Sequence, residues 1–272
     1  MTRKRSRLLL YLPLVAVAIF YLIPVYVMLV TGLKGFEEVN LKTMWDLPNG
    51  IQFDNFIEAY NKLAPHLWNS INMVLPAAVI SSILGSLNGY VLAKWKFKGA
   101  DIIFPLILFG MFIPYQSILI PLVEFMKTIN LYGGLPGLVL THVIYGIPIT
   151  TLTFRNYYAT IPKELVEAAK IDGAGMMGVY WNILLPISIP SFVVVLIWQF
   201  TQAWNDFLFA VVLTSPSNWP ITVALNNMAG SQIVAWNVQM AGSFLTALPT
   251  LLVYIFLGRY FLRGMMAGAL KG

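Results

Sequence analysis

Cysteine is absent from this 272-residue chain, and charged side chains are scarce. Without cysteine the chain has no disulfide framework, no thiolate metal site and no cysteine nucleophile. Charged residues make up 10% of the sequence, whereas a soluble domain carries about 25%. So few charges cannot cover a surface that faces water. Hydrophobic residues make up 58%, which also excludes a disordered chain.

The common motifs of catalysis are missing too. There is no G-x-x-x-x-G-K-[ST] phosphate-binding loop, because no glycine is followed by lysine. The two histidines, His66 and His142, lie far apart in the sequence and belong to no cluster with metal-ligand spacing. No Ser–His–Asp set with supporting context is recognisable. We therefore expect no catalytic residue, metal site or cofactor in this chain, and we do not expect it to be an enzyme.

What the sequence has in abundance is long apolar runs. A helix needs roughly 20 mostly apolar residues to cross about 30 Å of hydrocarbon, and in lipid each backbone amide must be paired within its segment. Six runs qualify, at about residues 8–30, 69–92, 102–123, 135–154, 187–213 and 240–262. They predict an all-α membrane protein with six transmembrane helices, forming one transmembrane domain over residues 1–272. Within the second run, Gly85-x-x-x-Gly89 predicts a close helix contact.

The basic residues predict the orientation of these helices. If the N-terminus is inside, only four of the 17 basic residues fall in outer segments: Lys34, Lys42, Lys62 and Lys127. Cytoplasmic segments of membrane proteins are the ones that carry excess lysine and arginine. We therefore expect both termini to be cytoplasmic in a multi-pass protein of the cell membrane. The net charge of +6 is then an orientation signal, and a role in nucleic-acid binding is not expected.

The predicted cytoplasmic loop 155–186 is long for a simple connection and has helical character. Pro162 suits the first turn of a helix, and residues 163–171 are mostly good helix formers. Gly173 can end that helix in a left-handed conformation, and a second short helix is expected over 176–183. Two interpretations remain open from the residues alone. The first helix lies on the lipid headgroups, or it presents small and acidic side chains to another protein.

The same loop carries the identity of the family. Its residues resemble, over the full spacing, the EAA signature of ABC-importer permeases. The matching residues are Glu167-Ala168-Ala169, then Gly173 after three residues, and then Ile183-x-Leu185-Pro186 after nine more. The sequence is similar to the carbohydrate branch of that family, on the side of the smaller subunit of the maltose permease. Further similar features are Pro65–Ser70, Asp172-Gly-Ala174, Trp204-Asn-Asp206 and the C-terminal Ala267-Gly-Ala-Leu-Lys-Gly272. The resemblance therefore extends from near the first apolar run to the last residue.

The resemblance implies a sugar permease of the type I ABC-importer kind, in which the EAA loop is the coupling helix that docks on a cytosolic ATPase. The implied partners are a homologous permease, two ATP-binding subunits that hold ATP and Mg²⁺, and an extracytoplasmic solute-binding protein. The implied ATPase-coupling residues are Glu164, Glu167, Ala168, Ala169, Asp172, Gly173, Ile183, Leu185 and Pro186. The C-terminal tail is a second candidate contact with the ATPase, through Met265 and Lys271.

Polar residues gather at the end of the fifth apolar run. Gln199, Gln202, Asn205 and Asp206 lie there, and Asp206 is the one acidic residue inside a predicted span. Because a carboxylate at membrane depth costs about 2.5–3.5 kcal/mol, Asp206 should face protein or water. Three interpretations stay open: it lines the solute path, it pairs with or caps neighbouring helices, or it lies near the outer interface. On helical spacing Gln199, Gln202 and Asp206 share one face, which favours the first two.

A self-contained ion-coupled carrier is the alternative function. Such carriers need intramembrane ionisable residues and often consist of two repeated halves. This chain offers one carboxylate and no clear internal repeat. Solute uptake that needs ATP hydrolysis by a second chain would distinguish the importer from the carrier.

Overall fold

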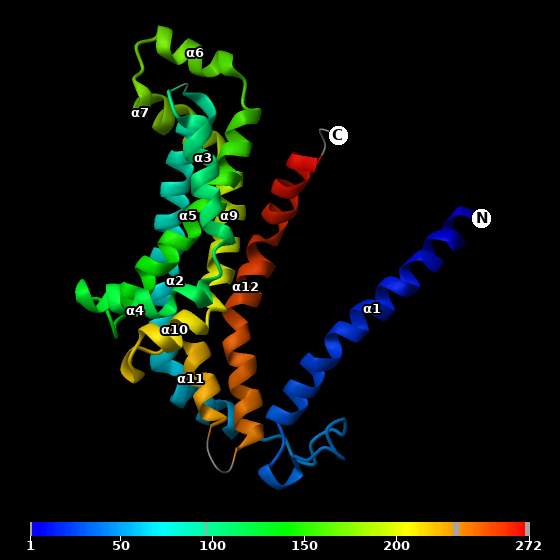
Figure 1. The fold of residues 1–272 in the computed structure, drawn as a ribbon. Coiled ribbons are helices and arrows are strands. Elements are labelled where there is room, and N and C mark those ends of the chain that lie inside the picture. The colour runs from blue at the N-terminus through cyan, green and yellow to red at the C-terminus, as the bar shows by residue number, and fades with distance from the viewer. Residues whose placement is uncertain (1, 96, 231–233, 270–272) are drawn as a thin grey trace. The chain divides into compact units, whose positions relative to one another are not determined.

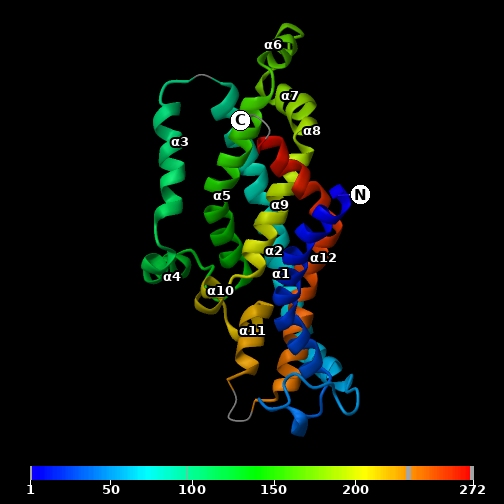
Figure 2. The same cartoon turned by 90° about the vertical axis from the view of Figure 1, so that its right-hand side faces the viewer.

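The computed structural model describes residues 2–95, 97–230 and 234–269. Within these ranges the chain is helical, with one isolated bridge between Gly133 and Thr214, as Figures 1 and 2 show from two directions. The longer helices are α1 (Thr2–Gly32), α2 (Asp54–Lys94), α3 (Ala100–Phe109), α4 (Leu119–Thr128), α5 (Leu135–Thr160), α6 (Lys163–Ile171), α9 (Ile189–Trp204), α11 (Ile221–Met228) and α12 (Trp236–Ala269). Three shorter ones are α7 (Met176–Val179), α8 (Leu185–Ile187) and α10 (Leu208–Leu213). The prediction of an all-α protein is confirmed.

The chain divides into two compact units. The first consists of Met1–Pro65 and Ala224–Leu248, and the second of His66–Val223 and Pro249–Gly272. The second unit contains the loop and the polar residues that the sequence singled out.

Four helical segments among the described residues are long and apolar enough to cross a membrane: Tyr11–Gly32, Asp54–Lys94, Leu135–Thr160 and Trp236–Tyr260. Two pairs of helices qualify together, although each pair is sharply bent: Ala100–Phe112 with Tyr115–Thr128, and Met176–Ile187 with Ile189–Trp204. If each pair counts as one span, the described chain has up to six spans, which is the number that the apolar runs predict.

The predicted run 102–123 is not one straight helix. Its two halves meet at an angle of 89°. At the bend Ile113 is extended, with φ −75° and ψ 118°, and it precedes Pro114. Proline disfavours the helical conformation of the residue before it, so the chain turns at this step. A prediction from hydropathy alone does not detect this break, because Ile113 and Pro114 are both apolar.

The predicted run 187–213 is interrupted as well. Helix α9 ends at Trp204, where the side-chain amide of Asn205 donates to the carbonyl oxygen of Thr201 at 2.9 Å. This bond satisfies one of the carbonyl groups that a helix end leaves unpaired. Asp206 therefore lies beyond the helix, and the expectation that it continues one helical face with Gln199 is wrong.

Helices α2 and α5 approach closely at two glycines of α2. A Cβ atom on Gly85 would overlap the side chain of Thr150, and one on Gly89 would lie 2.6 Å from the backbone nitrogen of Arg155. Only a residue without a side chain lets the two backbones come this near. The close contact predicted from the glycine spacing is confirmed, and both views show α2 beside α5 in the second unit (Figures 1 and 2).

In the first unit, Asn55 joins three segments. Its amide nitrogen donates to the carbonyl oxygens of Gly32 and Lys34, at 2.9 Å each. Its own carbonyl oxygen accepts a hydrogen bond from Asn237 of α12 at 2.9 Å. The ammonium group of the buried Lys34 donates to the carbonyl oxygen of Thr43 at 2.6 Å. These bonds fix the chain that follows α1 against the starts of α2 and α12.

Candidate functional site

The EAA segment forms helix α6, which lies at one end of the second unit, next to α7 (Figure 1). The helix covers Lys163–Ile171, as the sequence predicts, and Gly173 after it has φ +84°. This left-handed conformation suits glycine, which has no Cβ atom to clash with the backbone. The predicted turn and second helical piece are thus confirmed, the latter as α7 followed by a π-helical turn over Tyr180–Leu184.

One face of α6 is exposed and acidic, while the other packs on this chain. Glu164, Glu167 and Ala168 are exposed, whereas Val166 is 4% and Ala169 6% exposed. Ala169 belongs to a core cluster of the second unit. Its small side chain therefore serves this chain's own packing. Ala168 is exposed, so its contact with a partner stays a prediction, whereas the buried Ala169 does not offer its side chain to a partner.

The other signature residues lie around the same turn. Asp172, Gly173 and Pro186 are exposed, and Ile183 and Leu185 are half-buried against the core cluster. The tail candidates are different: Lys271 lies outside the described residues, and for Met265 only the helical backbone of α12 is described. The exposed residues of the loop also include Lys163, Leu165, Lys170 and Ile171. We call the acidic and small ones among the exposed residues the α6 surface: Glu164, Glu167, Ala168, Asp172 and Gly173.

A buried network of hydroxyl groups fixes this loop to the spans. The hydroxyl oxygen of Ser86 on α2 lies 2.6 Å from that of Tyr158 on α5 and 3.0 Å from that of Tyr180 after α7. Tyr158 in turn lies 3.1 Å from the hydroxyl oxygen of Ser188 before α9. All four residues are buried. Satisfied buried polar networks fix one arrangement of the elements that they join, so the loop and three helices are held as one body.

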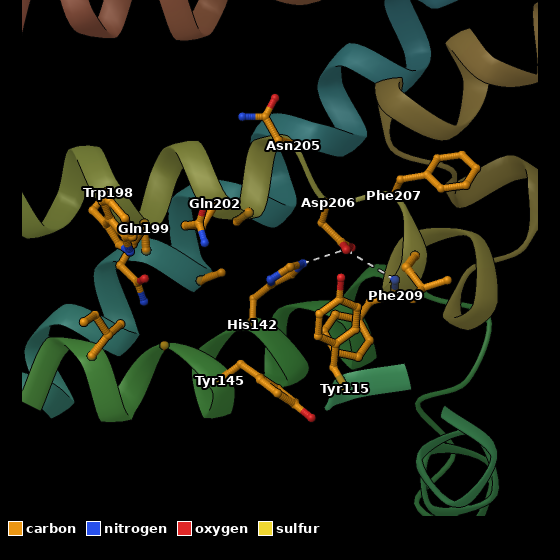
Figure 3. Close-up of a pocket in the computed structure, with 16 residues that line it drawn as sticks. Tyr115, His142, Tyr145, Trp198, Gln199, Gln202, Asn205, Asp206, Phe207 and Phe209 are labelled. Carbon is orange, nitrogen blue, oxygen red and sulfur yellow. Dashed lines mark hydrogen bonds and ion pairs between the residues drawn. The ribbon is translucent and has the colours of Figure 1, made fainter. Parts of the chain in front are cut away.

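A second site is a cavity of about 470 Å³ in the same unit, lined mainly by α5, α9 and the chain that follows α9 (Figure 3). At one wall, the Asp206 carboxylate lies 3.3 Å from Nε2 of His142 on α5. The same carboxylate accepts hydrogen bonds from the backbone N–H groups of Phe209 at 3.3 Å and Ala210 at 3.0 Å. Asp206 thus caps the start of α10, in the way that a carboxylate stabilises exposed N–H groups at a helix N-terminus.

The other polar residues predicted for this region point in different directions. Gln199 is buried, and its amide nitrogen donates to the hydroxyl of Ser81 on α2 at 2.8 Å. Asn205 folds back onto α9 and points away from the His142–Asp206 pair (Figure 3). Gln202 is exposed at the cavity. The structure therefore brings all four residues to one cavity, although the amide nitrogens of Gln199 and Asn205 are used within the fold.

Sequence reasoning missed His142 and the aromatic wall of this cavity. The ring of Phe209 lies 5.5 Å from that of Tyr115, 5.1 Å from that of Tyr145 and 6.1 Å from the His142 imidazole, measured between centroids. A signal for His142 was present, because it is an ionisable residue inside an apolar run and such residues are rarely without a partner. The aromatic residues carried no signal, since aromatic side chains are common throughout this chain.

Comparison with known proteins places this chain in a family. Residues 82–266 match the family model described as the inner membrane component of binding-protein-dependent transport systems. A probable ABC transporter permease of Pyrococcus horikoshii is 48% identical over 98% of both chains. The xylose/arabinose import permease XacI of Haloferax volcanii is 35% identical over 92% of this chain and 89% of its own. The glucose import permease GlcU of Saccharolobus solfataricus is 34% identical over 94% and 92%.

Solved structures show the same fold. A chain of a bacterial ABC transporter involved in the import of the acidic polysaccharide alginate superposes with a TM-score of 0.80, at 20% identity over 94% of this chain and 98% of that one. A chain of the MetNI methionine ABC transporter superposes with a TM-score of 0.58, at 17% identity over 74% and 95%. The predicted membrane-permease fold is thereby confirmed. On the match of the family model and of full-length relatives, the chain belongs to the family of binding-protein-dependent transport system inner membrane components.

Proposed function

We propose that this chain is a permease subunit of an ATP-driven sugar importer in the cell membrane. One observation carries the proposal: relatives named for xylose/arabinose import and for glucose import match 92% and 94% of this chain at 35% and 34% identity. A relative named for the transport of arabinooligosaccharides matches all of it at 31% identity. These names share carbohydrate as the substrate class and differ in the sugar.

Transport that depends on a binding protein excludes the alternative of a self-contained ion-coupled carrier. The remaining partners follow from the family as proposals. They are a homologous permease, two ATP-binding subunits that bind ATP and Mg²⁺, and an extracytoplasmic solute-binding protein. The chain would contribute one transmembrane domain of six spans, with the bent pairs counted as spans and with both termini cytoplasmic, as the distribution of lysine and arginine favours.

The α6 surface would be the contact with the ATP-binding subunit. Glu164 and Glu167 are exposed on it, and the small Ala168 between them and Gly173 allows close approach of another backbone. Leu165, 43% exposed, and Ile171, 86% exposed, add apolar area next to the carboxylates. An interface of this kind fits a cleft with an apolar floor and basic residues at its rim. Met265 and Lys271 of the tail would form a second contact with the same partner.

The cavity at the end of α9 supports a solute path along this subunit. Gln202 and Asp206 line it, while Gln199 would keep α9 fixed to α2 and Asn205 would end α9. Asp206 would then act mainly by shaping the wall, because its oxygens already accept hydrogen bonds from α10.

We expect Asp206→Asn to impair the transporter more than Glu58→Gln does. The first change replaces one carboxylate oxygen by an NH2 group, so one of the hydrogen bonds from α10 is lost, and a buried group left unpaired costs about 1–3 kcal/mol. Among the described residues, the control carboxylate pairs with Lys62 alone, at 2.6 Å, where both side chains are about half exposed, and such a pair contributes little. Thermal midpoints and uptake rates of both variants measure the difference. Equal values would mean that Asp206 has no special environment.

The proposed function is tested with the complete transporter in proteoliposomes. We expect import of at least one of labelled D-glucose, D-xylose and L-arabinose when ATP is present on the side of the ATP-binding subunits, and no import when this chain is left out. Uptake by this chain alone without ATP would contradict the proposal. If the complete transporter assembles with ATP present but imports none of these sugars and none of their oligosaccharides, the assignment of sugar as the substrate class is contradicted.

A further inference from the structure

The cavity beside α5 has an aromatic wall whose polar atoms are not used by the fold. Phe209, which is 6% exposed, packs against Tyr115, Tyr145 and His142 and so fixes the three rings. Among the described residues, neither tyrosine hydroxyl forms a hydrogen bond with another side chain or backbone group. Both residues line the cavity. The wall therefore offers ring faces together with two hydroxyl groups that can donate or accept.

His142 adds an imidazole to the lining of the cavity. Its Nε2 atom lies 3.3 Å from the Asp206 carboxylate, and the two point toward each other in Figure 3. A neutral imidazole that carries its proton on Nε2 presents Nδ1 as an acceptor. No hydrogen bond to Nδ1 occurs within the described part of the chain. Asp206, which already accepts from two backbone N–H groups of α10, lies close to His142 without forming a hydrogen bond with it.

The chemistry of the lining selects a neutral ligand. No lysine or arginine is among the described residues that line the cavity, and Asp206 is its one carboxylate. A cavity of about 470 Å³ falls within the range of about 300–1,000 Å³ usual for small-molecule sites. The aromatic rings can pack against apolar C–H faces, and the tyrosine hydroxyl groups and the Gln202 amide can form hydrogen bonds with hydroxyl groups. The lining therefore matches a molecule that has apolar C–H faces and a rim of hydroxyl groups. An acidic sugar would find no counter-charge here.

We propose that this cavity is a binding site for a neutral sugar on this subunit, in which Tyr115 and Tyr145 pack against the sugar ring and His142 and Gln202 bind its hydroxyl groups. The proposal rests on the proposed function for its ligand class. It adds that this subunit contacts the solute itself, through residues that include the two tyrosines and His142.

The test uses the complete transporter without its binding protein, so that only membrane subunits can bind. Saturation-transfer NMR with D-glucose and D-xylose as probes, and D-glucuronate as the acidic comparison, measures binding directly. We expect saturation transfer from the unchanged protein to a neutral sugar. We expect the affinity for that sugar to be about tenfold lower in Tyr145→Leu and in His142→Leu. Tyr145→Phe keeps the ring and should lose only about threefold. Tyr60→Leu, a change of an exposed tyrosine of the first unit, is the matched control and should bind as the unchanged protein does.

The outcomes separate this inference from the proposed function. If the unchanged transporter imports sugar with ATP but the cavity variants bind and import normally, the site is refuted and the proposed function stands. Tighter binding of D-glucuronate than of either neutral sugar would overturn the assignment to neutral ligands. Absence of any ATP-driven sugar import by the unchanged transporter would refute the proposed function itself. Thermal midpoints identify a variant that fails to fold, and Tyr145→Phe then gives the decisive comparison.

Discussion

Glu167→Lys should lower ATP-driven uptake at least about tenfold while the protein still folds and inserts. Glu167 is exposed on α6 and forms no hydrogen bond or ion pair with another described residue, so its replacement should change stability by less than about 0.5 kcal/mol. At a docking surface the effect is larger. A reversed charge leaves the partner's basic group facing a like charge, and a desolvated pair that is broken costs about 2–5 kcal/mol, where 1.4 kcal/mol is a factor of about ten.

Two measurements identify the cause of that loss. Co-purification of the ATP-binding subunits should fall together with uptake, whereas the thermal midpoint of the isolated chain should not change. Glu37→Lys reverses an exposed carboxylate of the first unit, outside the α6 surface, and should leave both uptake and co-purification unchanged. Normal uptake of Glu167→Lys with normal retention of the ATP-binding subunits would show that the α6 surface does not couple the two chains.

Gly89→Ala should destabilise the protein strongly, although alanine is the better helix former. The added Cβ atom would lie 2.6 Å from the backbone nitrogen of Arg155 and 2.8 Å from Cβ of Phe154. Neither atom is at the flexible end of a side chain, so α2 and α5 would have to separate. Overpacking of this kind costs about 1–3 kcal/mol or more, and we expect the thermal midpoint in detergent to fall by roughly 5 °C or more.

Gly258→Ala is the matched control in the same unit. Gly258 also lies inside a helix, α12, and a Cβ atom there would meet nothing within 4 Å. Both substitutions gain the same helix propensity of up to about 1 kcal/mol, so the difference between them isolates the contact with α5. Gly258→Ala should leave the midpoint unchanged or raise it slightly. Similar midpoints for the two variants would show that α2 and α5 are not in close contact at Gly89.

The two sites are connected by α9. Ser188, before the first residue of α9, belongs to the hydroxyl network beneath the α6 loop, and Gln202 at the cavity lies about 21 Å further along the helix, at 1.5 Å per residue. A packed helix moves as a rigid element. If the α6 surface docks on an ATP-binding subunit, a displacement of the loop would therefore reach the cavity wall through α9.

The sequence by itself determined the features that depend on neighbours along the chain. Helix α6 and its end are fixed by Pro162, by a run of helix formers and by Gly173, and these act through local backbone preferences. The apolar runs also needed no tertiary information, because the length of a run decides whether it can span a membrane. The spacing of Gly85 and Gly89 likewise indicated a contact, but it did not name α5 as the partner.

Only the tertiary structure decided which residues face one another. Ala169 turns inward because the core cluster of the second unit covers that side of α6, and nothing in the local sequence distinguishes it from Ala168. His142 and Asp206 are 64 positions apart in the sequence and meet only because α5 lies beside α9 and the chain beyond it. Asp206 reaches His142 because α9 ends before it. The physical reason is that helix propensity acts over a few residues, whereas the pairing of polar groups is settled by which helices pack together.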